Sequence, residues 1–189
     1  MDKETKSPNE AIHFAAESLL KTYNSSIYKY GDAWTKLSKN TICKTLIYKA
    51  NQLSEWHSKK QDSEKGENII IDMCNYVMFY YAKREFPHTG FKESIDAGCN
   101  VIILRSEPTG HIWTEWTTDN FVEWILNTCT RIRYLLKEYS AGTEFIDENM
   151  SDIFGYGLLA LAKKALKESK EPIIWKVVKT KNNPNNYER

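Results

Sequence analysis

The amino-acid sequence predicts a mainly α-helical protein, a bundle of about five helices built from two related helix pairs. Three observations lead to this fold class. Apolar residues recur three and four positions apart over most of the chain, which is the spacing of one face of an α-helix. Hydrophobic residues make up 41% and charged residues 27% of the 189 residues, the balance of an ordinary folded domain. A pattern of helix pairs also recurs at an offset of about 80 residues, as expected for an internal repeat.

The first helix has clear start and stop signals. Ser7 is a suitable N-cap, Pro8 stands at the first helical position, and Glu10 is the acidic residue of a capping box. The apolar spacing continues to Tyr30, and Gly31 can take the left-handed conformation that ends a helix.

Four further helices follow from the same apolar spacing. We expect a solvent-exposed connection over residues 58–66. The helix after it is apolar on most of its surface, which predicts burial on most sides in spite of its β-branched run. The expected helices cover residues 40–56, 67–84, 119–139 and 146–170.

Residues 86–116, between the two helix pairs, contain several prolines and glycines and lose the helical spacing. Residues 101–104 and 111–113 are short runs rich in β-branched and aromatic side chains, with Pro108 and Gly110 between them. We therefore expect a small insertion here that is either irregular or a β-hairpin.

The internal repeat relates residues 29–84 to residues 113–170. Aligning the two copies places Asp72 beside Asp152. Two antiparallel helix pairs that face each other form a four-helix bundle, with the polar residues of both copies in a shared cleft and the first helix outside. The alternative is coincidence, because any two amphipathic helix pairs resemble each other.

We expect a single helical domain over residues 1–175 and a mobile C-terminal tail over residues 176–189.

The chain has 26 basic and 25 acidic residues, a net charge of +1, which argues against binding extended nucleic acid or an anionic membrane. No stretch reaches the ~18–20 apolar residues of a membrane span, and the N-terminus has no signal-peptide core. Of the four separated cysteines, Cys43, Cys74 and Cys129 fall inside apolar helical patterns and are expected to be reduced core residues, which favours a cytoplasmic location. Whether the chain forms a homo-oligomer stays open.

Carboxylates on otherwise apolar helices are the candidate chemistry. Glu67 and Asp72 belong to the first copy of the repeat, and Glu148 and Asp152 to the second. Charged groups in such positions are costly unless they are paired or bound to a metal, and carboxylate oxygens are the ligands that Mg²⁺ or Mn²⁺ prefers. We therefore expect these four residues to hold Mg²⁺ or Mn²⁺ in the shared cleft, with Asn75 on the same helix face as Asp72.

A helix N-terminus would explain some of these acids without a metal, because negative charge is favoured in the first turn. Glu67, Asn68, Asp147 and Glu148 each fall in the first turn of an expected helix. The two aspartates of the repeat lie at least a turn deeper, so capping explains them less well.

Three tryptophans, Trp34, Trp113 and Trp116, lie outside the helical stripes, in segments that are expected to be loops. Such rings either stack on the base of a ligand or pack against the protein itself.

A family resemblance is carried by residues 29–34 (KYGDAW), by Glu67 and Asn68 shortly before Asp72, and by Asn75. Together these motifs resemble the phage-associated "nucleotide modification associated domain" family. That family is related to the all-α nucleoside triphosphate pyrophosphatases, the MazG and dimeric dUTPase group. The resemblance covers residues 20–84.

The resemblance implies a hydrolase that cleaves a (deoxy)nucleoside triphosphate between its α- and β-phosphates, using Mg²⁺ bound by helix carboxylates, and releases the monophosphate and pyrophosphate. It implies that Glu67 and Asp72 are catalytic metal ligands. Nucleotide contacts are implied for the base-stacking Trp34, for Asn75, for the phosphate-binding Lys29 or Lys49, and for Asp32 in the same motif.

Two alternatives stay open, because the paired ExxE and ExxD motifs of those pyrophosphatases are incomplete here. The chain is then either a nucleotide-binding or nucleotide-sequestering phage protein with little turnover, or a helical interaction protein whose acids cap helices.

Overall fold

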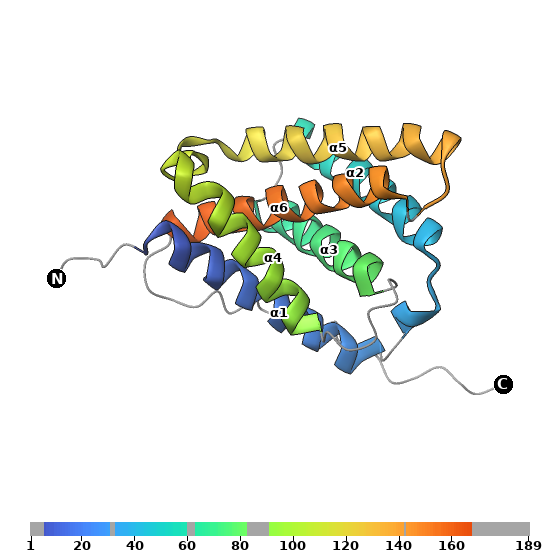
Figure 1. The fold of residues 1–189 in the computed structure, drawn as a ribbon, viewed down its shortest axis with the longest axis horizontal. Helices are drawn as coiled ribbons and strands as arrows, with labels where there is room; N and C mark the ends of the chain where they lie inside the picture. The colour runs from blue at the N-terminus through green and yellow to red at the C-terminus, as the bar shows by residue number, and fades with distance from the viewer. Residues whose placement is uncertain (1–5, 31–32, 60–62, 83–90, 142, 168–189) are drawn as a thin grey trace.

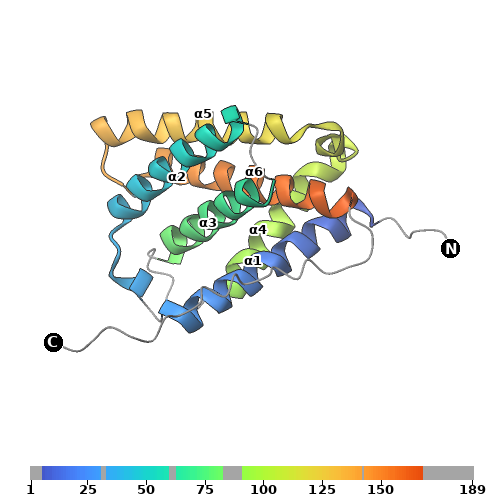
Figure 2. The same cartoon turned by 180° about the vertical axis from the view of Figure 1, so that it is seen from behind.

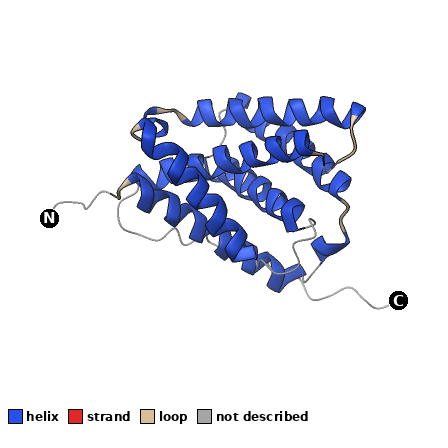
Figure 3. Cartoon of the chain, viewed as in Figure 1, coloured by secondary structure: helices blue, strands red, loops and turns tan. Residues whose placement is uncertain are grey.

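Figure 1 shows a computed structural model of the protein, which describes residues 6–30, 33–59, 63–82, 91–141 and 143–167. These residues form helices and connecting turns, and no β-strand occurs among them (Figure 3). The mainly helical fold class is therefore confirmed. In chain order the elements are α1 (Pro8–Tyr30), η1 (Ala33–Lys36), α2 (Lys39–Lys59), α3 (Ser63–Ala82), α4 (Phe91–Ser106), η2 (Glu107–Thr109), η3 (Ile112–Glu115), α5 (Thr118–Glu138) and α6 (Glu144–Lys167).

Helix α1 begins at the capping box expected from the sequence. The Ser7 hydroxyl accepts a hydrogen bond from the Glu10 backbone N–H at 3.3 Å. The Ser7 backbone N–H donates to Glu10 Oε2 at 2.7 Å, so a second backbone N–H group at the helix start has a hydrogen-bond partner. This backbone hydrogen bond holds the pKa of the Glu10 carboxyl below its usual value.

The six long helices of the described part of the chain are arranged in three layers (Figures 1 and 2). The α2–α3 pair packs on the α5–α6 pair, with α2 against α5 and α3 against α6, and these four helices form the bundle. Helix α1 packs against α6, α4 and α3, and so lies outside the bundle together with α4. Helices α3 and α6 are therefore the central layer, between α2 and α5 on one side and α1 and α4 on the other.

The central position of α3 explains why its sequence is apolar on most sides. Ile69, Ile70, Ile71, Met73 and Cys74 are consecutive or nearly so, and all of them are buried. A helix with one covered face would bury only every third or fourth residue, whereas α3 contacts α2, α6, α1 and α4.

The expected connection over residues 58–66 is shorter in the structure, because α2 continues to Lys59 and α3 begins at Ser63. Gly66 makes the early start possible. It is buried against the Trp56 ring of α2, and a Cβ at this position would overlap that ring. The prediction of a connection is therefore wrong for residues 58–59 and 63–66, which are helical, although Ser58, Lys59, Glu64 and Lys65 are exposed as expected, and residues 60–62 lie outside the described part of the chain.

The β-hairpin alternative for residues 86–116 is wrong. Residues 101–104 belong to α4, and residues 112–113 belong to the 3₁₀ helix η3. Ile95 and Cys99 are buried at a spacing of four, and Ile102 is half-buried, so the inner face of α4 packs on α1 with helical periodicity. Within residues 91–116, the part of this segment that the structure describes, only the turns around η2 and η3 match the expected irregular insertion.

The second pair agrees closely with its predicted bounds, since α5 covers Thr118–Glu138 and α6 covers Glu144–Lys167. Among the described residues, no helix combines the length and the apolar character that crossing a membrane requires. The expected tail over residues 176–189 lies outside the described residues, and the internal repeat stays a prediction.

Candidate functional site

The predicted metal ligand Glu67 lies in the second turn of α3 and faces α6. Its Oε2 atom accepts a hydrogen bond from Lys164 Nζ at 2.6 Å, and its side chain is 14% exposed. Since α3 begins at Ser63, Glu67 and Asn68 are not in a first turn, and the capping alternative for both residues is wrong.

Asp72 faces a different helix. Its Oδ2 atom lies 2.6 Å from Nζ of Lys49 on α2, and the Asp72 side chain is 46% exposed. Five residues separate Asp72 from Glu67, which rotates their side chains roughly 140° apart around the helix axis. Each acid of the first copy is therefore paired with its own lysine, and the two point to different neighbouring helices.

The acids of the second copy lie further along the bundle. Helices α3 and α6 run antiparallel, because Glu67 meets Lys164, Gly157 faces Cys74, and the Tyr81 hydroxyl donates to the Asp147 carbonyl at 2.9 Å. In this register Asp152 lies opposite about residue 79 of α3, roughly 10 Å along the axis from Asp72.

The described residues contain no group of three or more His, Cys, Asp or Glu side chains that could hold a metal ion. Glu67, Asp72, Glu148 and Asp152 as placed therefore do not fit one Mg²⁺ site, and the expected cleft shared by these four residues is not formed by the described side chains. The reason is the antiparallel register, which moves equivalent positions of the two copies apart. Glu148 is exposed and lies beyond the first turn of α6, so capping does not explain it either.

The remaining predicted ligand contacts are scattered. Trp34 in η1 stacks on Phe79 of α3, with ring centroids 5.1 Å apart and an angle of 8°. Asn75 is only 6% exposed, and its Oδ1 atom has no hydrogen-bond partner among the described residues. Asp32 and the side chain of Lys29 lie outside the described part. The nucleotide contacts expected of these residues stay predictions.

A cavity of about 670 Å³ lies elsewhere, between α3, α4, α6 and the segment 109–116. Its volume is within the usual range of small-molecule sites. Val101 and Ile112 stand at its wall and are 46% and 48% exposed, so solvent reaches it. Five aromatic side chains contribute to the lining, namely Tyr81, Trp113, Trp116, Phe154 and Tyr156. Two of these, Trp113 and Trp116, are rings that the sequence singles out as stacking candidates.

Among the residues that the structure describes, two charged ones line this pocket, Arg105 from α4 and Asp152 from α6. Neither forms a hydrogen bond or an ion pair with another described residue, and they do not pair with each other. This distinguishes Asp152 from Glu67 and Asp72, whose charges are compensated by lysines. The pocket therefore offers one positive and one negative group on a mostly aromatic and aliphatic surface.

Close helix packing shapes the inner wall of the pocket. Gly98 of α4 faces the Phe154 ring of α6, where an added Cβ would lie 2.6 Å from the ring. Gly155, the next residue on α6, lines the pocket, and a Cβ added there would meet no atom within 4 Å. The Tyr81 hydroxyl also lies 3.2 Å from the Ser151 hydroxyl and so joins the end of α3 to the pocket side of α6.

The segment after α4 forms the outer wall because it turns sharply. Gly110 and His111 have positive φ angles of 62° and 58°, the left-handed conformation that reverses the chain direction. The turn is held by a contact of 3.1 Å between Ser106 Oγ and His111 Nδ1, and by the His111 backbone N–H, which donates to the Ser106 carbonyl at 2.9 Å. Lys163 of α6 donates to the Thr114 carbonyl and ties this segment to the central layer.

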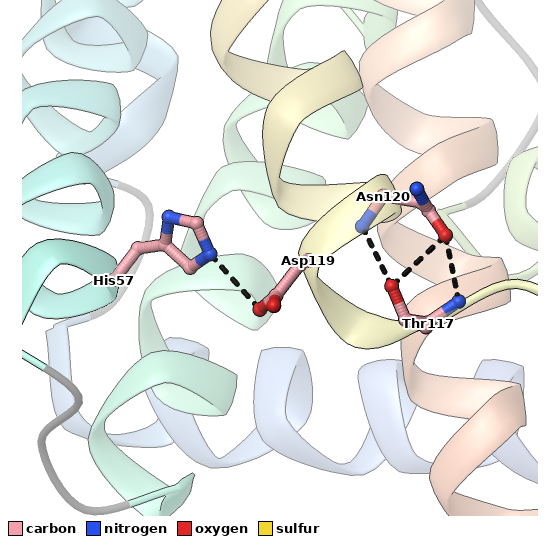
Figure 4. A network of polar contacts seen from close by, with 4 residues as sticks. All are labelled: His57, Thr117, Asp119 and Asn120. Atoms are coloured by element: carbon pink, nitrogen blue, oxygen red, sulfur yellow. Dashed lines mark hydrogen bonds and ion pairs between the residues drawn. The ribbon is translucent and has the colours of Figure 1, made fainter.

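Figure 4 shows how the start of α5 is anchored beyond this segment. Thr117 accepts a hydrogen bond from the Asn120 backbone N–H at 3.3 Å, and Asn120 Oδ1 accepts from the Thr117 backbone N–H at 2.8 Å. Asp119 in the same turn lies 2.9 Å from His57 Nε2 at the end of α2. The adjoining Trp116, which lines the pocket, is thus next to a fixed helix start.

Aromatic packing continues from the pocket into the bundle. Trp124 contacts both Trp116 and Tyr156, with ring centroids 4.4 Å and 5.3 Å apart. Burial raises the pKa of the Tyr156 hydroxyl, and the nearby Asp152 carboxylate raises it further. Sequence reasoning missed Arg105 because this residue fell in the segment expected to be an irregular or β-hairpin insertion, whereas the structure places it in the last turn of α4.

Comparison of the chain with protein-family models, with curated proteins and with solved structures gives no match.

Proposed function

We propose that this protein binds a nucleotide in the pocket between α3, α4 and α6. The observation that carries the proposal is the presence of two opposite charges, Arg105 and Asp152, that line an aromatic cavity and have no partner among the described residues.

Arg105 is the group suited to the phosphate. A guanidinium binds phosphate oxygens through two parallel N–H donors, and such charge-assisted hydrogen bonds are among the strong ones. Arg105 lies at the end of α4, where its side chain is exposed and also contributes to the pocket lining. A phosphate held there would stay close to solvent, which lowers the cost of removing water from it.

The aromatic lining is suited to the base. Flat rings stack on aromatic side chains, and a stacked base gains roughly 1–3 kcal/mol. Trp116 and Tyr156 lie at the same part of the lining, since both contact Trp124. Nucleotide binding agrees with the family resemblance, although it uses a different set of residues from the one that the resemblance implies.

Hydrolysis to the monophosphate and pyrophosphate is the second candidate. The observation that favours it is an unpaired carboxylate, Asp152, in the same pocket as Arg105. A carboxylate next to a bound phosphate chain can orient a water molecule and accept its proton. The expected Mg²⁺ requirement stays a prediction, because Glu67, Asp72, Glu148 and Asp152 as placed do not fit one metal site.

The test measures binding of nucleoside mono- and triphosphates by titration calorimetry, with and without Mg²⁺. We expect Arg105→Gln to weaken binding about 10- to 100-fold, the effect of losing a charged hydrogen bond. Arg133→Gln is the matched control, because Arg133 is exposed on α5, outside the pocket lining. Gly155→Leu should abolish binding without unfolding the protein, because its side chain would enter open pocket space.

The proposal is overturned if no nucleotide binds, or if Arg105→Gln and Gly155→Leu bind as the unmodified protein does. Pyrophosphate release from the triphosphates, measured in the same samples, decides between binding alone and hydrolysis.

A further inference from the structure

We infer that Asp152 is a specificity-determining residue and makes guanine the preferred base of the bound nucleotide. This inference rests on the proposed nucleotide binding and adds the identity of the base to it; because it places Asp152 at the base edge rather than at the phosphate chain, it excludes Asp152 as the group that activates water in the hydrolysis candidate.

The chemistry of an ionised carboxylate leads to this choice. Both of its oxygens accept hydrogen bonds and neither can donate, so it pairs best with two adjacent donors. Guanine presents two adjacent donors, N1–H and the N2 amino group. Adenine and cytosine present an amino group next to a ring nitrogen that accepts, and uracil and thymine present a single N–H between two carbonyl groups. Guanine is therefore the standard base whose edge matches both oxygens.

The surroundings of Asp152 leave its carboxylate available for such an edge. The side chain is half-buried on α6, lines the pocket, and makes no hydrogen bond or ion pair with another described residue. Two polar groups in the preceding turn of α6 already have a hydrogen-bond partner from α3. The Tyr81 hydroxyl donates to the Asp147 carbonyl and lies within hydrogen-bond distance of the Ser151 hydroxyl. A partly buried carboxylate without a partner favours a ligand that supplies donors.

Tyr156 is placed to hold the base plane beside this carboxylate. It lies four residues after Asp152, so both side chains are on the same face of α6, and both line the pocket. The Asp152 charge reaches the Tyr156 hydroxyl, because it contributes to the raised pKa of that group. A base that stacks on the Tyr156 ring thus has its polar edge near Asp152, while Arg105 is available to the phosphate.

The test compares four purine monophosphates by titration calorimetry: GMP, IMP, XMP and AMP. IMP lacks the N2 amino group and keeps N1–H, and XMP replaces that amino group by a carbonyl. The unmodified protein should bind GMP about 10- to 100-fold more tightly than AMP or XMP, the usual discrimination of one bidentate pair, with IMP between them.

Asp152→Asn should reverse the preference. An asparagine side chain presents one acceptor and one donor, which match the N1–H and the C2 carbonyl of xanthine. The variant should therefore lose GMP affinity about 10- to 100-fold and prefer XMP to GMP. Glu148→Gln is the matched control, because it removes an exposed carboxylate one turn earlier on α6, outside the pocket lining, and should leave the order of affinities unchanged.

The inference is overturned if the four nucleotides bind equally well, if AMP binds best, or if Asp152→Asn keeps the preference for GMP. Those outcomes leave the proposed function intact as long as Arg105→Gln still weakens binding of every nucleotide. If no nucleotide binds the unmodified protein, the proposed function itself fails.

Discussion

At the scale of single residues, two glycines on α6 differ in what surrounds them. Gly155 lines the pocket, and a Cβ added there would meet no atom within 4 Å. Gly157 lies at the interface of α6 with α3, where an added Cβ would be 2.5 Å from the Cys74 sulfur. The first glycine keeps the pocket open, and the second lets the two central helices approach closely.

This difference predicts opposite effects of the same substitution. Gly155→Ala should raise the free energy of unfolding by about 0.5–1 kcal/mol, because alanine loses less backbone entropy in a helix than glycine does. Gly157→Ala should lower it by about 1–3 kcal/mol, because the extra methyl group must displace a buried sulfur or separate α3 from α6. Urea unfolding followed by circular dichroism measures both, and equal shifts in the same direction would contradict the placement of these glycines.

At the scale of elements, the start of α5 depends on a short polar network rather than on burial. Thr117 and Asn120 satisfy each other's backbone N–H groups, and Asp119 contacts His57 of α2 (Figure 4). These side chains are exposed or only half-buried, so they stabilise the start of α5 through hydrogen bonds that its first turn would otherwise lack.

Thr117→Ala should therefore lower the free energy of unfolding by about 1 kcal/mol, the usual cost of removing an N-cap side chain. Thr118→Ala is the matched control, because Thr118 is the next residue, is also exposed, and makes no side-chain hydrogen bond with a described residue. We expect the control to change stability little in the same urea titration. Equal losses in the two variants would show that the capping box does not stabilise α5.

Helix α4 is the element that the sequence did not predict. Its run of four apolar residues, 101–104, suits a strand as well as a helix, and the prolines and glycines nearby favoured a turn-rich insertion. Packing on α1 decides in favour of the helix, because it buries Ile95 and Cys99 on one face and leaves Val101 and Leu104 exposed. The pocket depends on this helix, which contributes Arg105 and much of the lining.

At the scale of the whole molecule, the interior is formed mainly by apolar side chains, and four thiols are buried within it. Burial raises the pKa of Cys43, Cys74, Cys99 and Cys129 from 9.0 to about 12. All four cysteines are free and buried, as expected for Cys43, Cys74 and Cys129 from their position in apolar helical patterns, and Cys99 joins them because it lies on the inner face of α4.

These raised pKa values predict a loss of stability at alkaline pH. In the unfolded chain the thiols ionise near pH 9, whereas the folded protein keeps them protonated to about pH 12. The stabilisation is therefore complete below pH 9 and is lost as pH rises from 9 towards 12, by about 1.4 kcal/mol per pH unit for each thiol ionised only in the unfolded chain. Urea titrations at a series of pH values measure this decline.

Cys129→Ala provides the control for this decline, because it removes one ionising thiol and should make the pH dependence shallower. A free energy of unfolding that stays constant up to pH 11 would contradict the burial of these cysteines. So would rapid reaction of the native protein with a thiol reagent at neutral pH.

The start of α1 and the bounds of α5 and α6 were determined by the sequence alone. Ser7 and Glu10 specify the start of α1 through local hydrogen bonds, and the apolar spacing of α5 and α6 defines those helices to within two residues at the ends that the structure describes. Such features are predictable because they depend on neighbours three or four positions away. The burial of α3 on most sides was likewise evident from its composition.

Tertiary structure determined the composition of the site, including the surroundings of the carboxylates Glu67 and Asp72. Whether Glu67 and Asp72 stay uncompensated depends on where Lys164 and Lys49 lie, and those lysines come from other helices. The antiparallel register of α3 and α6 separates the two copies of the acidic pattern, and the position of α4 brings Arg105 into one pocket with Asp152. Local spacing determines which face of a helix a side chain occupies, but only the packing of distant helices determines what that face meets.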